Sequence, residues 1–463
     1  MIAEAFRGQG TGKPPGSWKT LLGTRRIRAG GQPPPMIAEG FPPPAVRNPP
    51  RSWKPLLATP GIRGVLVARI VSGAADGFLP VTLSFAVLRV TDSASRLGLV
   101  LATQATTALL VTLVGGLAGD RFPRARVMTA SLLARMAAAG VLAGTLLAGA
   151  PPFGLVLAMA AGYGCADGFF GPAAAALLPG VVSPAQLTAA NAVIGGSTSA
   201  ASIAAPAAAG LIVAVVGPGT AFAVQAGFLA AAAACLAASQ AGTSRPGTCP
   251  ARGTPAQGTG ARVARQLADG FAAFARLRWL WLLTAEWAGF SLIVLAPLAV
   301  LGPVISQQDL GGARAWGLIS SALAAGAVGG QIAAGRMPRP ARPALVIAAL
   351  VPVMTAEALA LGLGAPLAVI IAAAAVAGLA MGAQAVLFPV AMQTAVPSGL
   401  LARVAAIDLL ASEAGQPAGY ALAGPAAAVI GAHAVLAAGA AGLLAAGTAF
   451  AWLRPLRDPV GPP

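Results

Sequence analysis

The sequence predicts an all-α membrane protein in which twelve transmembrane helices form two pseudo-symmetric bundles of six. Three observations lead to this prediction: the composition, a series of apolar runs of spanning length, and a repeat that relates the two halves of the chain. Of the 463 residues, 57% are hydrophobic, 59 are glycine and only 9% are charged. A soluble surface needs about 25% charged residues, and a disordered chain is far less apolar. The composition therefore indicates a lipid environment.

Residues 1–62 differ from the rest, because they are rich in Pro, Gly and Arg and have no apolar periodicity. The tetrapeptide that begins at Met1 recurs at Met36, an offset of 35 residues. The first copy lacks the apolar core and the small-residue cleavage site of a signal peptide. We predict a disordered basic tail, with either methionine as the true start.

Twelve apolar runs follow, each of about 20 residues or more and thus long enough to cross a bilayer as a helix. They lack the alternation of barrel strands and are rich in the small residues that helix packing in lipid requires. The polar stretch 239–276 divides them into a bundle over 63–238 and a bundle over 277–453, followed by a tail over 454–463. The predicted spans are 64–88, 97–119, 127–149, 152–178, 188–216, 219–238, 279–303, 315–335, 343–363, 366–392, 404–430 and 433–453.

The basic residues predict the orientation of these spans. With the N-terminus inside, 25 of the 30 Lys and Arg residues fall on the cytoplasmic side and only 3 on the outer side. This asymmetry satisfies the positive-inside rule. We therefore expect a multi-pass protein of the cytoplasmic membrane, with both termini and the central loop 239–276 in the cytoplasm. The net charge of +17 is then a topology signal, and no nucleic-acid partner is expected.

The two halves of the chain also match each other at a constant offset of 214 residues. Parallel repeats of six helices are the architecture of one large class of secondary transporters. The matched positions are Gly115 and Gly116 with Gly329 and Gly330, Val182 with Val396, Gly210 with Gly424, and Gly217 with Gly431.

The loop after the span 97–119 contains Gly116, Asp120, Arg121 and Arg124. It resembles the signature loop of the major facilitator superfamily, G-x-x-x-D-R-x-G-R-R/K, with proline in place of the second glycine and the last base shifted by one place. The resemblance implies a twelve-helix secondary transporter, in which this gating loop latches the two half-domains electrostatically in one state. The alternative, a short turn with topology charges, explains the arginines but not Asp120.

The span 188–216 contains Pro206 and Gly210, in a segment that resembles the G-P-x-x-G element of exporters in this superfamily. A proline within a spanning helix frees a carbonyl and bends the helix, and small neighbours allow another helix to approach. An ordinary kinked, Ala-rich helix remains the alternative. Residues 168–173 and 187–191 resemble the enterobactin-exporter and macrolide-efflux branch.

Four intramembrane acids are the candidate residues for proton coupling and for the substrate cavity: Asp76, Asp167, Glu286 and Glu413. Acids in lipid are costly, so each is a functional hypothesis, with a hydrogen-bonded packing role as the alternative. By resemblance, the four spans that carry them line the central cavity. An isolated carboxylate of this kind can exchange a proton with each side in turn, and Asp76 and Asp167 lie nearest the midplane.

Three other charged residues receive lesser roles. Asp408 is expected nearer the cytoplasmic end of its span. Arg135 and Glu357 lie on spans that the resemblance places at the periphery, so they are expected to be structural pairing residues.

Several classes of function are excluded by what the sequence lacks. The single histidine, His433, cannot build a multi-histidine metal site or a histidine-based triad, and the three cysteines lie far apart. No phosphate-binding loop is present. We expect no enzymatic activity, no catalytic residues, no metal and no cofactor. The prediction is a monomeric, proton-coupled exporter of small amphipathic molecules, such as a drug, an antibiotic or a siderophore-like compound, with membrane lipids around it. An importer of the same fold and a non-transporting membrane scaffold are the alternatives.

Overall fold

The computed structural model describes residues 60–118, 123–181, 187–241, 271–272, 274–338 and 340–450. All regular secondary structure in these ranges is helical. The predicted tails before residue 60 and after residue 450 lie outside the described residues, as does most of the predicted central loop.

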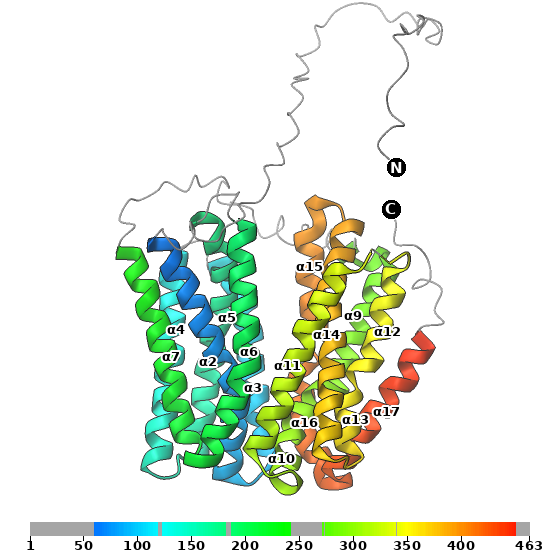
Figure 1. Ribbon diagram of the computed structural model, residues 1–463. Helices are drawn as coiled ribbons and strands as arrows, with labels where there is room; N and C mark the ends of the chain where they lie inside the picture. The colour runs from blue at the N-terminus through cyan, green and yellow to red at the C-terminus, as the bar shows by residue number, and fades with distance from the viewer. Residues whose placement is uncertain are drawn as a thin grey trace, which may run out of the picture. The chain divides into compact units, whose positions relative to one another are not determined.

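Six helices form the N-terminal half, and each is one continuous helix of 24 to 32 residues. Figure 1 shows them in blue to green. They are α2 (Pro60–Thr91), α3 (Ala94–Ala118), α4 (Arg124–Ala148), α5 (Phe153–Val181), α6 (Leu187–Val216) and α7 (Pro218–Ala241).

The described part of the C-terminal half also contains six helical rods, but three of them are interrupted. The seventh is α9 (Arg278–Phe290), a π-helical turn η1 (Ser291–Leu295) and α10 (Ala296–Asp309). The ninth is α12 (Pro343–Met354) with α13 (Ala356–Gly362), and the eleventh is α15 (Ser398–Glu413) with α16 (Gln416–Ile430). The continuous ones are α11 (Ala313–Arg336), α14 (Leu367–Ala395) and α17 (Ala432–Phe450).

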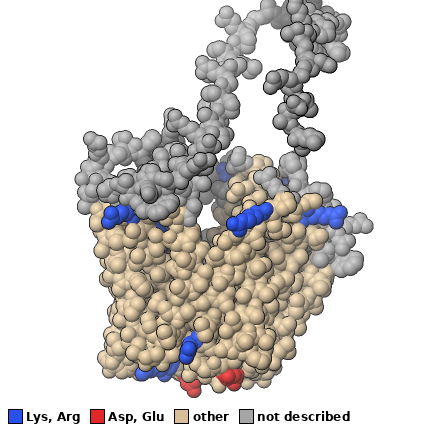
Figure 2. Space-filling view, viewed as in Figure 1, with Lys and Arg blue, Asp and Glu red and all other residues tan. Residues whose placement is uncertain are grey.

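Eleven helical segments among the described residues are long and apolar enough to cross a membrane. The predicted span 404–430 is absent from this count because Ala414 and Gly415 divide it into two helices of 16 and 15 residues. The predicted all-α membrane fold is confirmed. Figure 2 shows a broad band of this face without charged side chains, bordered by basic residues at one edge and by residues of both signs toward the other.

The structure explains why the offset of 214 recurs. Gly217 and Gly431 each end a helix with a positive φ, 94° and 89°, which favours glycine. Their N–H groups donate to the carbonyls of Val213 and Ala427, which are themselves 214 residues apart. The two halves therefore use the same helix-ending turn.

Two further glycine pairs share this offset. Gly164 and Gly168 of α5 lie against backbone carbonyls of α3, and Gly378 and Gly382 of α14 lie against backbone carbonyls of α11. A side chain at any of the four would collide with the neighbouring backbone. The α3–α5 and α11–α14 pairs are thus equivalent close packings, as expected between helices in lipid.

The two halves contact each other through α6 with α11 and through α3 with α16, and α10 also touches α2 and α3. At the first contact Gly210 meets Gly317, and at the second Gly424 meets Ser95. Because Gly210 and Gly424 are matched positions of the repeat, the two contacts are pseudo-symmetric. Figure 1 shows the two groups of helices meeting near α10 and separating toward α15.

Candidate functional site

The first group of functional side chains is a cluster centred on Arg135, in the middle of α4. The Arg135 side chain is fully buried (0% exposed) and forms an ion pair with Asp76 of α2. Its Nη1 lies 3.3 Å from Oδ1 of Asp167 on α5, so three helices converge on one guanidinium. Its Nη2 also donates a hydrogen bond of 2.8 Å to the hydroxyl of Tyr163.

Three neighbouring side chains support this guanidinium. The Tyr163 ring centre lies 4.8 Å from Cζ of Arg135. Gln225 of α7 donates from Nε2 to the Tyr163 hydroxyl (3.3 Å) and to a backbone carbonyl of α2 (3.2 Å). The Phe170 ring contacts both Arg135 and Arg69, at 5.5 Å and 5.4 Å from the two Cζ atoms. Contacts from α2 and α5 therefore orient Arg135 between its acids, and Gln225 of α7 holds the Tyr163 side chain beside it.

The cluster contains one more carboxylate than the guanidinium can balance. Among the described residues, Asp76 and Asp167 form ion pairs only with Arg135, and their side chains are 46% and 48% exposed. Contrary to the expectation from sequence, the two acids are not isolated. Arg135 forms ion pairs, as expected, and its partners are the two candidate acids Asp76 and Asp167. The sequence signal for Arg135 was its position in an apolar span, because an ionisable residue there is costly unless it is paired.

Glu286 lies on α9 in the other half and is almost completely buried, with 5% of its surface exposed. Neither of its carboxylate oxygens has a hydrogen-bond partner among the described residues. A buried carboxyl group without a partner is costly, which marks Glu286 as a candidate functional residue. Glu357 of α13 is buried as well, and its Oε2 also lacks a partner in the described part of the chain.

A cavity of about 290 Å³ lies between α9, α14 and α15, and we call it the C-half pocket. It contains Asp408 and Glu413, which sequence reasoning placed in different roles. Thr284 donates its hydroxyl to Asp408, and Nε1 of Trp287 donates to Glu413 over 3.3 Å. The helix break directly after Glu413 could have indicated this pocket, because interrupted helices mark binding sites in transporters.

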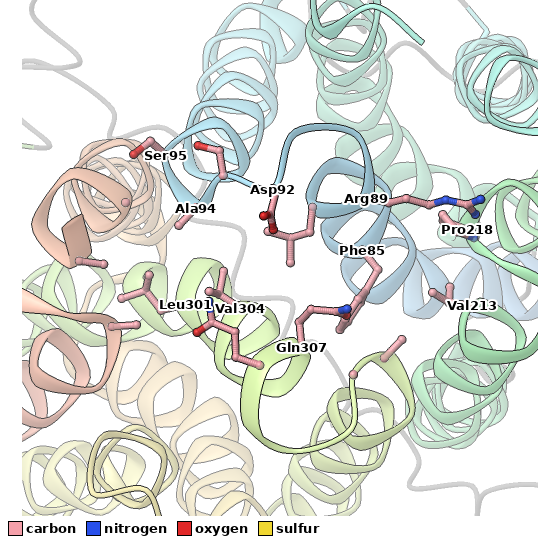
Figure 3. A pocket seen from close by; sticks show the side chains of 18 of the residues that line it. Phe85, Arg89, Asp92, Ala94, Ser95, Val213, Pro218, Leu301, Val304 and Gln307 are labelled. Atoms are coloured by element: carbon pink, nitrogen blue, oxygen red, sulfur yellow. The ribbon is translucent and has the colours of Figure 1, made fainter. Parts of the chain in front are cut away.

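A larger cavity, of about 960 Å³, lies where the turns after α2 and α10 face each other. Figure 3 shows Asp92 and Gln307 beside its open space, and Arg89 turned toward Pro218. Gly424, which contacts α3, also lines this cavity. The contacts between the halves therefore border it.

A sequence model described as Major Facilitator Superfamily matches residues 65–419. The chain belongs to the Major Facilitator Superfamily. Its match spans both halves, so this membrane protein is a multi-pass transporter and not an enzyme. No curated protein matches the chain.

Solved transporters have the same fold at low sequence identity. A bacterial homolog of the human lysosomal transporter Spinster has 15% identity and a TM-score of 0.59, covering 88% of this chain and 98% of its own. The nucleoside transporter NupG has 12% identity and a TM-score of 0.63, over 84% and 99%. A bacterial homologue of the iron transporter ferroportin has 15% identity and a TM-score of 0.61, over 86% and 100%. At these identities the likeness concerns the fold alone.

The structure describes the predicted gating loop only in part, but it describes the Pro206–Gly210 segment fully. Of the gating-loop residues, Gly116 lies in α3 and Arg124 begins α4, whereas Asp120 and Arg121 lie outside the described residues. Pro206 and Gly210 of α6 both contact α11: a Cβ at Gly317 would lie 2.6 Å from the Pro206 carbonyl oxygen and 3.2 Å from Cα of Gly210. The Pro206–Gly210 segment of α6 thus forms a contact between the halves.

Proposed function

We propose that this transporter is a proton-coupled exporter, an antiporter of small amphipathic molecules in the cytoplasmic membrane. One observation carries the proposal: Asp76 and Asp167, on two different helices, share the single buried guanidinium of Arg135. With both acids ionised, these three side chains carry one negative charge in excess. Binding one proton neutralises the group, and this is what a coupling site must do.

The geometry suggests how that proton could be coupled to movement. When Asp76 is protonated, Arg135 keeps Asp167 as its ionised partner; when Asp167 is protonated, Arg135 keeps Asp76. Asp76 lies on α2, which contacts α10 and α11 of the other half. A change in the partner of Arg135 can therefore bias the contacts between the halves, which is the differential interaction that a conformational shift requires.

Alternating access requires the contacts at Gly210 and Gly424 to open. In the orientation that the basic residues predict, this contact end faces the outside. The described contacts between the halves at Gly210 and Gly424 would then lie near the outer surface. Substrate would enter from the cytoplasm, reach the acids, and leave when the glycine contacts separate.

The direction of transport rests on the resemblance of the Pro206–Gly210 element to that of exporters, and on the resemblance of residues 168–173 and 187–191 to the enterobactin-exporter and macrolide-efflux branch. Glu286 and Glu413 remain second candidates for proton transfer, as buried or pocket-lining acids of the other half. A monomer suffices, because both halves of the site come from one chain.

Everted membrane vesicles test this function. Vesicles with and without the protein are energised and given a panel of fluorescent amphipathic compounds. We expect at least one compound to accumulate inside the vesicles only when the protein is present, and an uncoupler to abolish the accumulation. Uptake into right-side-out vesicles instead would indicate an importer. Accumulation that the uncoupler leaves unchanged would contradict proton coupling.

A further inference from the structure

The C-half pocket differs in charge from the Arg135 cluster. Its lining includes Asp408 and Glu413, and contains no lysine, arginine or histidine. Neither acid forms an ion pair with any residue that the structure describes. In the N-terminal half, by contrast, the acids are held against a guanidinium. The C-half pocket therefore holds two carboxyl groups without a cationic partner among the described residues.

The hydrogen-bonding capacity of this pocket is also incompletely used. Thr284 donates to Asp408, and Trp287 donates to Glu413. An ionised carboxylate has about four acceptor positions, so most of them remain open. Gln384 of α14 lines the same pocket, is 8% exposed, and has a buried Oε1 without a donor among the described residues. The pocket thus has acceptor positions that no described donor occupies.

The remaining walls are apolar and aromatic. Trp287 and Phe388 supply aromatic rings, and Leu283 and Met381 supply aliphatic surface. Aromatic faces attract cations by about 0.5–2 kcal/mol and exclude water from an apolar group. The volume of about 290 Å³ lies at the lower limit of ligand pockets, which suits one small ligand.

We infer that the C-half pocket binds a small monovalent organic cation, an amine or quaternary ammonium carried on one aromatic or aliphatic group, as the transported substrate. The positive charge lies between Asp408 and Glu413, and the apolar group lies against Trp287 and Phe388. An amine with N–H donors also satisfies the orphaned oxygen of Gln384. This inference rests on the proposed function and specifies its substrate class.

The first test uses the wild-type protein in lipid nanodiscs and a pair of ligands of equal shape. Phenyltrimethylammonium carries the charge, and tert-butylbenzene is its neutral counterpart. Calorimetry should show that phenyltrimethylammonium binds with a stoichiometry of one, and that tert-butylbenzene binds at least tenfold more weakly. Equal affinity for the two ligands would overturn the inference, because an apolar pocket would then explain the binding.

Variants locate the binding. Asp408→Asn and Glu413→Gln should each weaken phenyltrimethylammonium binding at least tenfold, and Asp309→Asn, which removes an acid outside the pocket, should leave it unchanged. Gln384→Leu should weaken binding of phenethylammonium, which has N–H donors, more than binding of phenyltrimethylammonium, which has none. Unchanged affinity in both acid variants would place the ligand elsewhere and refute the inference.

The result is separable from the proposed function. If phenyltrimethylammonium fails to bind while uncoupler-sensitive accumulation of another compound persists, the substrate class is wrong and proton-coupled export stands. If phenyltrimethylammonium binds in the pocket but no uncoupler-sensitive accumulation is found, the pocket stands and the proposed function fails.

Discussion

The shared guanidinium makes a quantitative prediction about stability. Asp76→Asn or Asp167→Asn alone leaves Arg135 with one carboxylate partner, whereas the double variant leaves a fully buried guanidinium with none among the described acids. The two substitutions should therefore be strongly non-additive. No such effect is expected if each acid has a separate role.

The expected size follows from exposure. The two acids are 46% and 48% exposed, so their ion pairs are partly screened, and each single change should cost about 1 kcal/mol or less. Removing the last partner of a buried charge costs about 3–5 kcal/mol. The double variant should thus lose about 1–3 kcal/mol more than the sum of the single variants.

Reversible unfolding in mixed detergent micelles measures this difference as the free energy of unfolding at one micelle composition. A triple variant that adds Arg135→Met is the control, because removing the buried charge should restore most of the lost stability. Additivity of the two acid substitutions within about 0.5 kcal/mol would refute the shared-partner reasoning.

Three further predictions concern other parts of the transporter. Gly210→Leu and Gly424→Leu should each reduce transport strongly, because a larger side chain blocks closure between the halves. Gly227→Leu is the control, because that position has open space around it, and it should not reduce transport. Substrate accumulation in vesicles is measured for the three variants. Asp120→Asn should impair transport while protein abundance stays near wild type. Unchanged transport kinetics would refute the gating role and leave the loop as a short turn whose charges only set the topology. Gly217→Ala should lower the free energy of unfolding by about 1 kcal/mol or more, because its φ of 94° strains any other residue; an unchanged value in the same unfolding assay would contradict this.

The all-α membrane fold was predictable because it depends on quantities that a sequence displays directly. These quantities are the length of the apolar runs, the unequal distribution of Lys and Arg between the two sides of the membrane, and the constant offset between the two halves. None of them depends on how each helix is rotated about its axis. The matched glycines, such as Gly210 and Gly424, turned out to lie at equivalent contacts. A glycine can match by chance in a Gly-rich chain, but at both of these positions a neighbouring backbone leaves no room for a side chain.

The pairing within the site was not predictable in the same way. Arg135, Asp76 and Asp167 meet only because α2, α4 and α5 turn particular faces toward one point, and the rotation of each helix depends on packing throughout the bundle. The same holds for Asp408 and Glu413 in the C-half pocket. Sequence identified the acids as costly in lipid, but only the packed structure shows which acids have a cation beside them.

The two halves have come to differ in charge although they share one architecture. In the N-terminal half Asp76 and Asp167 pair with a guanidinium, whereas Asp408 and Glu413 of the C-terminal half form no ion pair among the described residues. In the proposed mechanism, proton binding at the Arg135 cluster and cation binding in the C-half pocket would be coupled through the change in the contacts between the halves. Such a division explains why the repeat is visible in the packing glycines and not in the charged residues.

The central claim is that the Arg135 cluster takes up the coupling proton, and transport in proteoliposomes tests it most directly. Wild-type protein, Asp76→Asn and Asp167→Asn are each assayed for uphill transport driven by a pH gradient and for downhill exchange without one. The account predicts that at least one of these variants loses uphill transport and retains exchange at close to the wild-type rate. Uphill transport at wild-type rates in both variants would contradict it.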